Sequence, residues 1–177
     1  MNQTELESLV AEHRRFPAVL RALTGSLPAV TLRAREAEGR WSPLEILAHL
    51  RDEELEDFRP RAQAAAAAAP ITRGIDPQGW VLSRAYNTLD AAQVLADFER
   101  ERAASCAWLA SLDVKLLDSF IEHAALGRMR CGDFVAAWRM HDLLHLRQLA
   151  TALARLESTQ LKGWSIAYAG DLERLKA

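Results

Sequence analysis

The 177-residue sequence is short of the residues that interrupt helices. Glycine occurs 8 times and proline 6 times, and we find no run in which apolar and polar residues alternate. Such runs are typical of half-buried strands, so their absence argues against a β-sheet protein. Half of the residues are hydrophobic, and the chain is long enough to bury a core as one domain of residues 1–177. We therefore predict an all-α fold.

Three further absences narrow the class of protein. The two cysteines, Cys106 and Cys131, are too few for a disulfide framework, and the N-terminus lacks the features of a signal peptide. No apolar run approaches the roughly 20 residues that a membrane-spanning helix needs. The net charge of −2, with both signs interspersed, gives no surface suited to nucleic acid or anionic lipid. We expect a cytoplasmic protein that binds neither membrane nor nucleic acid.

Periodicity and helix-start signals predict four long helices. The first three begin with capping pairs, namely Thr4 with Glu7, Ser42 with Glu45, and Asp90 with Gln93. Pro60 is expected to end or bend the second helix, because proline cannot donate a backbone hydrogen bond. We expect an up-down four-helix bundle with an additional C-terminal segment and no β-sheet, its helices near residues 4–23, 42–69, 90–112 and 133–155. The connections at residues 70–89 and 118–130 are predicted to be irregular.

The last predicted helix places two histidines on one face. His141 and His145 lie one turn apart, on the same stripe as Phe134, Trp138 and Leu149. One interpretation is that both rings bind the same metal ion, as the histidines of the HExxH motif do. The other is that both are core histidines satisfied by polar neighbours, because an unpartnered buried imidazole costs roughly 1–3 kcal/mol. A metal site needs a third ligand from elsewhere in the chain.

A third histidine, His49, lies in the second predicted helix, where periodicity argues against a role in a buried site. Leucines gather on one side of this helix, whereas His49 falls among Glu45, Glu53 and Glu56 on the other. Periodicity favours a solvated histidine on an acidic face. The alternative is that this face lines a polar cleft, in which Glu53 orients the ring of His49.

Three more polar residues have two interpretations each. His13 lies in the apolar stripe of the first helix, either as a hydrogen-bonded core residue or as part of the lining of a site. His123 lies in a predicted loop, near or away from the mouth of that site. Arg102 falls in the apolar seam of the third helix and must be paired, either with a carboxylate of the second helix or with an anionic ligand.

Aromatic residues outside the four helices are expected to cover the bundle. Trp80 and Tyr86, with Asn87, either wall a pocket or clasp one end of the bundle. Trp164 and Tyr168 in the C-terminal segment are predicted to pack back on the helices.

Two segments resemble a known family. Residues 41–54 read WSPLEILAHLRDEE and residues 140–149 read MHDLLHLRQL, which fit the patterns W-S-x-x-E-x-x-x-H-L-x-D and H-D-x-x-H-x-x-Q. In these patterns the chain is similar to the DinB-like superfamily of four-helix-bundle metalloproteins, and the similarity spans nearly the whole chain. The resemblance implies that His49, His141 and His145 bind one divalent metal ion. It also implies that the acidic face of the second helix borders a cleft rather than bulk solvent.

The resemblance implies a metal-dependent enzyme, because some relatives are thiol transferases and others are thiol-dependent isomerases. Three imidazole ligands leave coordination positions open, as catalytic sites require, and zinc and nickel both suit such ligands. We expect a homodimeric low-molecular-weight-thiol S-transferase or related enzyme, or a hydrolase, that acts on a small molecule. The alternative is a non-catalytic metal-binding or dimerising bundle. Whether neighbouring polar residues take part in the site is left open for Glu53, Asp142, His13, His123 and Arg102.

Overall fold

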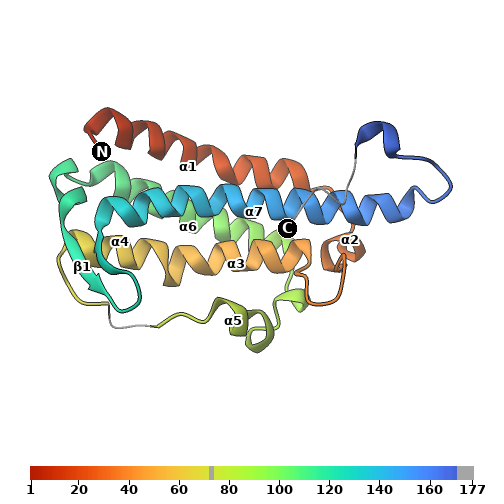
Figure 1. Cartoon of the computed structure of the whole chain (residues 1–177), viewed down its shortest axis with the longest axis horizontal. Helices are drawn as coiled ribbons and strands as arrows, with labels where there is room; N and C mark the ends of the chain where they lie inside the picture. The colour runs from red at the N-terminus through yellow and green to blue at the C-terminus, as the bar shows by residue number, and fades with distance from the viewer. Residues whose placement is uncertain (72–73, 171–177) are drawn as a thin grey trace.

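Four long helices form the body of the protein, whose computed structural model describes residues 1–71 and 74–170 (Figure 1). In chain order they are α1 (Gln3–Thr24), α3 (Pro43–Glu56) continued by α4 (Phe58–Ala66), α6 (Ala91–Ser111) and α7 (Cys131–Gln160). The predicted all-α four-helix bundle is confirmed. Within the described ranges, we find no helix that combines the length and the apolar character needed to cross a membrane.

Shorter elements connect the long helices. They are α2 (Ala29–Arg33), α5 (Pro77–Ser83), β1 (Phe120–His123), β2 (Gly127–Arg130) and the 3₁₀ turns η1 (Tyr86–Thr88), η2 (Val114–Asp118) and η3 (Ala167–Ala169). The connection between α4 and α6, which contains α5, runs back along the length of the bundle (Figure 1). This return allows the next long helix to start at the same end as α3.

The four helices run up, down, down and up. In Figure 1, α1 and α7 run from left to right, and α3, α4 and α6 run from right to left. The contacts agree, because Leu47 and Leu95 line the same cavity and Glu54 bonds Arg102. Direction therefore alternates from α1 to α3 and from α6 to α7, whereas α3 and α6 are parallel neighbours. Helix α3 packs against both α6 and α7, and α1 packs against the same two helices.

The core consists of two apolar clusters with a polar layer between them. One cluster contains Val10, Phe58 and Leu109, and the other contains Phe16, Leu50 and Phe98. Buried polar side chains from all four long helices lie at intermediate positions between the clusters, among them His13, His49, Glu53, Glu54, Arg102, Ser105 and Asp142. Each long helix thus contributes polar residues to the middle of the bundle, where a site is shielded at both ends.

The helix starts follow the predicted capping chemistry with one shift. The Ser42–Glu45 capping box and the Asp90 cap are present as predicted. The first helix instead begins with a capping box of Asn2 and Glu5, which corrects the predicted pair of Thr4 and Glu7. Asparagine caps a helix at least as well as threonine, and its pair has the same three-residue spacing, so the earlier start is preferred.

The second long helix is interrupted at Asp57, three residues before the predicted position. Asp57 has φ −122° and ψ −84°, which separates α3 from α4. Pro60 falls in the first turn of α4, where a missing backbone N–H costs little. Proline has no N–H to donate to the carbonyl of Glu56, four residues earlier, and this accounts for the position of the break.

Two connections that we predicted to be irregular contain regular structure. Within residues 70–89, Asp76 accepts a hydrogen bond from the backbone N–H of Gly79 and Pro77 occupies the first position of α5. These are strong helix-start signals, so the expectation of a loop was wrong.

The other connection, residues 118–130, forms a β-hairpin, which corrects the expectation of no β-sheet. Strands β1 and β2 pair antiparallel, with Ile121 opposite Met129 and His123 opposite Gly127. Three residues close the hairpin, and Gly127 has the positive φ of 70° that such loops require after the turn. The hairpin joins α6 to α7 and leaves the bundle intact.

The C-terminal segment does not pack on the helices as predicted. Trp164 is 80 % exposed and Tyr168 is fully exposed. The segment leaves the bundle at the far end of α7 (Figure 1), where no apolar partner covers these rings within the described residues. The prediction was based only on the apolar character of these residues and identified no surface against which they could pack.

Candidate metal centre

Three histidine side chains converge in the polar layer. Nε2 of His49, from α3, lies 3.2 Å from Nε2 of His141 and 3.1 Å from Nε2 of His145, both from α7. One ring nitrogen from each histidine lies within 4.8 Å of the others, so the three could hold one metal ion. His49 is buried, and His141 and His145 are partly buried. We call these three residues the histidine cluster.

The local sequence explains why the rings converge. The spacing of four residues puts His141 and His145 on one side of α7. The start of α3 is fixed by its capping box and by Pro43 at the first helical position, which sets the register of His49. Since α3 packs against α7 in the opposite direction, His49 lies opposite the pair.

His49 is not the solvated histidine that helical periodicity favours, because its side chain is only 3 % exposed. Both sides of α3 are buried: the leucine side packs in the core, and the polar side carries the buried residues Asp52, Glu53 and Glu54. Periodicity failed because it assumes that a polar side faces water. The acidic residues have internal partners instead; for example, Asp52 accepts hydrogen bonds from Arg51, Arg84 and Tyr86.

Burial keeps the three imidazoles neutral. Desolvation, with charge repulsion from His145 and His141, lowers the pKa of His49 to about 2. Desolvation also lowers the pKa of His141 to about 3 and lowers the pKa of His145 from its ordinary value. A neutral imidazole keeps a lone pair on one ring nitrogen, and this is the form that binds metal ions.

Gln148 orients the ring of His145. Its Oε1 atom lies 2.7 Å from Nδ1 of His145. An amide oxygen only accepts hydrogen bonds, so Nδ1 donates and the lone pair is left on Nε2, which faces the other two rings. This contact explains the glutamine of the H-D-x-x-H-x-x-Q pattern, to which the sequence alone assigned no role.

The histidine cluster fits a cation better than it fits mutual hydrogen bonds. A neutral imidazole donates from one nitrogen and accepts at the other, so three Nε2 atoms that face one another cannot all be satisfied among themselves. A divalent ion would be bound by all three Nε2 lone pairs, so the residues present fit a metal.

Glu53 lies beside the histidine cluster, one turn from His49. Its Oε1 atom is 3.6 Å from Nδ1 of His49, which is beyond hydrogen-bond distance. Desolvation, together with a hydrogen bond to Asp57 and the charge of Asp57, raises the pKa of Glu53 to about 9. The side chain is therefore protonated at neutral pH, a form that binds metal ions poorly.

Aromatic rings cover two sides of the cluster. Trp41 is stacked on His145, with ring centroids 6.2 Å apart and planes 6° apart. The ring of Phe58 lies 4.8 Å from that of His141. Neither wall was predicted from the sequence, although Trp41 belongs to the W-S-x-x-E pattern, because no spacing rule links either residue to the histidines.

A second polar group lies next to the histidine cluster, centred on Arg102. The guanidinium donates to both carboxylate oxygens of Asp142, at 2.7 Å each, and its Nε donates to Glu54 at 2.7 Å. Glu54 also accepts from Ser105 at 2.6 Å and from Trp138 at 2.9 Å. Nδ1 of His13 lies 3.0 Å from the guanidinium. We call this group the arginine cluster: His13, Glu54, Arg102, Ser105, Trp138 and Asp142.

The arginine cluster settles three of the open interpretations. Arg102 is paired with a carboxylate of the second helix, as one alternative predicted, and Asp142 occupies its remaining donors. No donor is left for an anionic ligand. His13 is a hydrogen-bonded core residue, and Asp142 contacts Arg102 rather than the three converging nitrogens.

The remaining predicted residues lie outside the histidine cluster. His123 ends β1 and accepts from the backbone N–H groups of Ala125 and Leu126. Tyr86 is buried and donates to Asp52, while Asn87 bonds the backbone of Arg33. These contacts support the clasp rather than the pocket wall.

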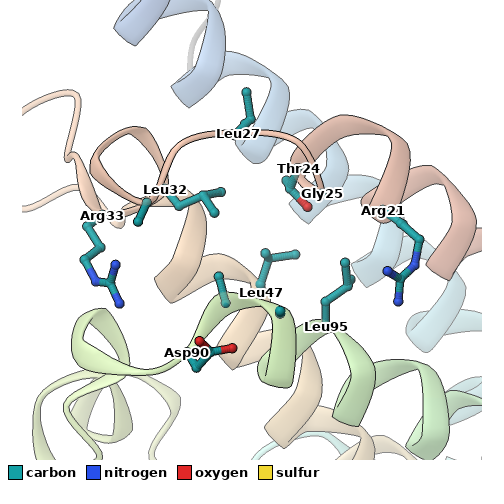
Figure 2. Close-up of a pocket in the computed structure, with 12 residues that line it drawn as sticks. Arg21, Thr24, Gly25, Leu27, Leu32, Arg33, Leu47, Asp90 and Leu95 are labelled. Carbon is teal, nitrogen blue, oxygen red and sulfur yellow. The ribbon is translucent and has the colours of Figure 1, made fainter.

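A cavity of about 280 Å³ opens beside His145. Its lining residues are Gly39, Arg40, Trp41, Gln78, His145 and Gln148. A second cavity, of about 240 Å³, lies between α1, α2 and α6 (Figure 2). Its arginines are already engaged, since Arg21 bonds Glu99 and Arg33 bonds the carbonyls of Asn87 and Leu89. Only the cavity beside His145, of these two, is lined by a member of the histidine cluster.

The bundle and the histidine cluster define a helical protein with a candidate centre for one divalent ion. The sequence profile of the DinB superfamily matches residues 12–149, which is most of the chain. The chain therefore belongs to the DinB superfamily. No curated protein sequence matches it.

A solved structure shares the fold. It is YfiT from Bacillus subtilis, described as a probable metal-dependent hydrolase with an unusual four-helix bundle topology. The two structures agree with a TM-score of 0.77 over 93 % of this chain and 91 % of YfiT, at 17 % sequence identity. This likeness confirms the four-helix-bundle fold.

Proposed function

We propose that this chain is a metal-dependent enzyme in which His49, His141 and His145 hold one divalent ion, zinc or nickel. The observation that carries the proposal is the convergence of three neutral imidazoles from two helices through their Nε2 atoms. Structural zinc sites use four protein ligands, whereas catalytic sites use three and leave a position for substrate or water. Imidazole ligands suit both zinc and nickel.

The proposed reaction is S-transfer from a low-molecular-weight thiol. A divalent ion bound by imidazoles lowers the pKa of a thiol or of water and so supplies a nucleophile at neutral pH. The protein's own groups shape the site: Gln148 fixes the ring of His145, and Trp41 and Phe58 exclude water from two sides. The cavity beside His145 is large enough for a small molecule.

Hydrolysis is the second candidate, supported by the fold similarity to YfiT, a probable metal-dependent hydrolase. Water would then take the place of the thiol. Hydrolysis benefits from a general base whose pKa lies near the working pH. Glu53, the carboxyl group beside His49, has its pKa raised to about 9 by desolvation and by Asp57 and is protonated at neutral pH. We place thiol transfer first because residues 41–54 and 140–149 resemble a family that includes thiol transferases.

Metal analysis of protein purified without an affinity tag tests the proposal. We expect about one divalent ion per chain in the wild type and a large loss in His49→Ala, since three ligands leave none to spare. Addition of 2-mercaptoethanol to the cobalt-substituted protein should then change its visible spectrum, and a thiol-transfer screen and an ester-hydrolysis screen separate the two reactions. A centre that binds metal but is inert to thiol, ester and water favours the non-catalytic alternative.

We also propose that the protein is a homodimer in the cytoplasm. Apolar side chains on the outer face of α7 support a dimer, because Met140, Leu143 and Leu144 are 55, 39 and 52 % exposed. Both cysteines are free and buried, which suits a reducing compartment. Light scattering of the wild type and of Leu144→Arg tests the dimer, and a monomeric wild type would refute it.

A further inference from the structure

The cavity beside His145 is rich in hydrogen-bond donors. Its six lining residues include no aspartate or glutamate. The Oε1 atom of Gln148 is used by Nδ1 of His145, so the amide NH₂ of Gln148 is left to donate. Arg40 adds a guanidinium with five N–H donors and a permanent positive charge. A ligand that complements this lining must offer acceptors, and preferably negative charge.

Arg40 differs from the arginines around it. Arg35 is paired with Glu45, Arg51 with Asp52, and Arg84 with Asp52 and Glu56. In the part of the chain that the structure describes, Arg40 has neither an ion pair nor a side-chain hydrogen bond, and it is exposed at the rim of the cavity. Its guanidinium is free to bind an anion from solution.

Trp41 contributes a planar apolar wall to the same cavity. Its ring is stacked on that of His145, with the two planes 6° apart. A ligand between Arg40 and His145 would therefore lie along an aromatic surface, with its charged end at the rim and its other end at the histidine cluster. The cavity of about 280 Å³ suits a small molecule and excludes a folded protein.

We propose that this cavity binds the substrate and that Arg40 recognises an anionic group, a carboxylate or a phosphate, on a small molecule whose reacting atom lies at the histidine cluster. The inference rests on the proposed function for the reacting atom, whereas the anion site stands on the cavity alone. Arg40 is a specificity-determining residue in this scheme. Its planar fork matches carboxylate and phosphate oxygens with two parallel hydrogen bonds.

Anion binding to the metal-free, ¹⁵N-labelled protein tests the inference without any assumption about catalysis. The probes are propionate and inorganic phosphate, with propionamide as the neutral control, at low ionic strength because salt screens exposed charges. We expect the indole N–H signal of Trp41, assigned with Trp41→Phe, to shift and saturate with one of the two anions. Propionamide should leave that signal in place. Comparison of propionate with phosphate identifies the preferred anion.

Matched variants locate the binding group. We expect Arg40→Gln to weaken anion binding at least fivefold and Arg40→Lys to keep part of the affinity, since lysine retains the charge and loses the fork. Arg147→Gln removes the same charge from an exposed position on α7, outside the cavity lining, and should leave the affinity unchanged. A wild type without a saturable shift, or an Arg40→Gln variant that binds as tightly as the wild type, overturns the inference.

Zinc binding, measured by calorimetry on the same variants, separates this inference from the proposed function. Arg40→Gln should bind zinc as the wild type does, because Arg40 does not belong to the histidine cluster. Anion binding without zinc binding would refute the proposed function and leave the anion site standing. Zinc binding without an Arg40-dependent anion shift would refute the anion site and leave the proposed function standing.

Discussion

The histidine cluster and the arginine cluster lie side by side in the same polar layer, yet they satisfy their polar atoms in opposite ways. In the arginine cluster, a guanidinium meets two carboxylates through hydrogen bonds of 2.7 Å, and Ser105 and Trp138 occupy further acceptor sites of Glu54. Nε2 of His13 is the one side-chain atom of this cluster that lacks a hydrogen-bond partner among the described residues. In the histidine cluster, three Nε2 atoms face one another, and two Nδ1 atoms lack partners among the described residues.

The difference separates a structural cluster from one built to bind. A buried charge is tolerated when protein groups satisfy it, and the arginine cluster links all four helices in this way. A buried group left unsatisfied by the protein costs free energy unless something from outside completes it. A metal ion would complete the three convergent Nε2 lone pairs.

The largest effect is expected from Arg102→Ala. This change leaves the carboxylates of Glu54 and Asp142 buried without their cation, and removal of one partner from a buried ion pair typically costs about 3–5 kcal/mol. Urea denaturation of the metal-free protein measures the loss. The control is Arg100→Ala, two residues away on the exposed side of α6, which should change the free energy of unfolding by less than about 0.5 kcal/mol. Equal losses in the two variants would contradict the comparison.

Metal binding to the histidine cluster should stabilise the folded protein by somewhat less than Arg102→Ala destabilises it. A ligand that binds only the folded protein stabilises it by about 2.7 kcal/mol when its free concentration is 100 times its Kd. We expect zinc to raise the melting temperature of the wild type and to have no effect on His141→Ala, which loses the two-histidine chelate of α7. Calorimetry with and without zinc checks this. A His141→Ala protein with full metal content and an unchanged zinc response would refute it.

The sequence predicts those features of the two clusters that are set by the spacing of residues within one helix. The pair of His141 and His145, the capping box at Ser42 and the pairing of Arg102 all follow from positions along single helices. His49 was assigned to the site only through the family resemblance. The helical wheel of α3 describes a single helix and carries no information on how α3 packs against α7. The walls formed by Trp41 and Phe58 depend on tertiary packing and were missed.

The same limit explains the errors in the fold. Helix lengths and the bundle were predictable from periodicity, whereas the parallel run of α3 and α6 depends on a connection that returns along the bundle. The hairpin of β1 and β2 has short strands in which only Ile121 is buried, so alternation is too brief to detect.

A change in pH should act through the histidine cluster and, with the opposite sign, through Glu53, whose pKa is raised to about 9. The pKa of His49 is lowered to about 2 and that of His141 to about 3, chiefly by desolvation, whereas an unfolded histidine has a pKa of about 6.5. At these two residues the unfolded chain therefore takes up protons that the folded chain does not, and their contribution to stability is lost as the pH falls below about 6.5. Each of these residues should contribute a loss of about 2 kcal/mol between pH 7 and pH 5.

Urea denaturation of the metal-free protein at the two pH values measures this loss. His49→Gln removes one titrating group, so the variant should lose about 2 kcal/mol less than the wild type over the same interval. Identical pH dependence in the two proteins would show that His49 is not held neutral by its surroundings.

The smallest effect is expected at Glu53, which lies next to Glu54 in the sequence, where the two clusters meet. Desolvation and the neighbouring Asp57 raise the pKa of Glu53 to about 9, so its folded form is protonated at pH 7 while its unfolded form is charged. For a raised pKa, stability is present below the unfolded value and is lost as the pH rises toward the folded value. Glu53→Gln removes this loss, but its extra amide N–H lacks a partner, which costs about 1–3 kcal/mol. The net result at pH 7 should be a gain of about 1 kcal/mol or no change.

Glu54→Gln, one residue on, removes the carboxylate that faces Arg102, Ser105 and Trp138, and should cost about 3 kcal/mol. Denaturation of both variants in the presence of a chelator compares them directly. Equal losses would mean that Glu53 is a charged partner like Glu54, and that the polar side of α3 is one continuous ionic network rather than two clusters with different tasks.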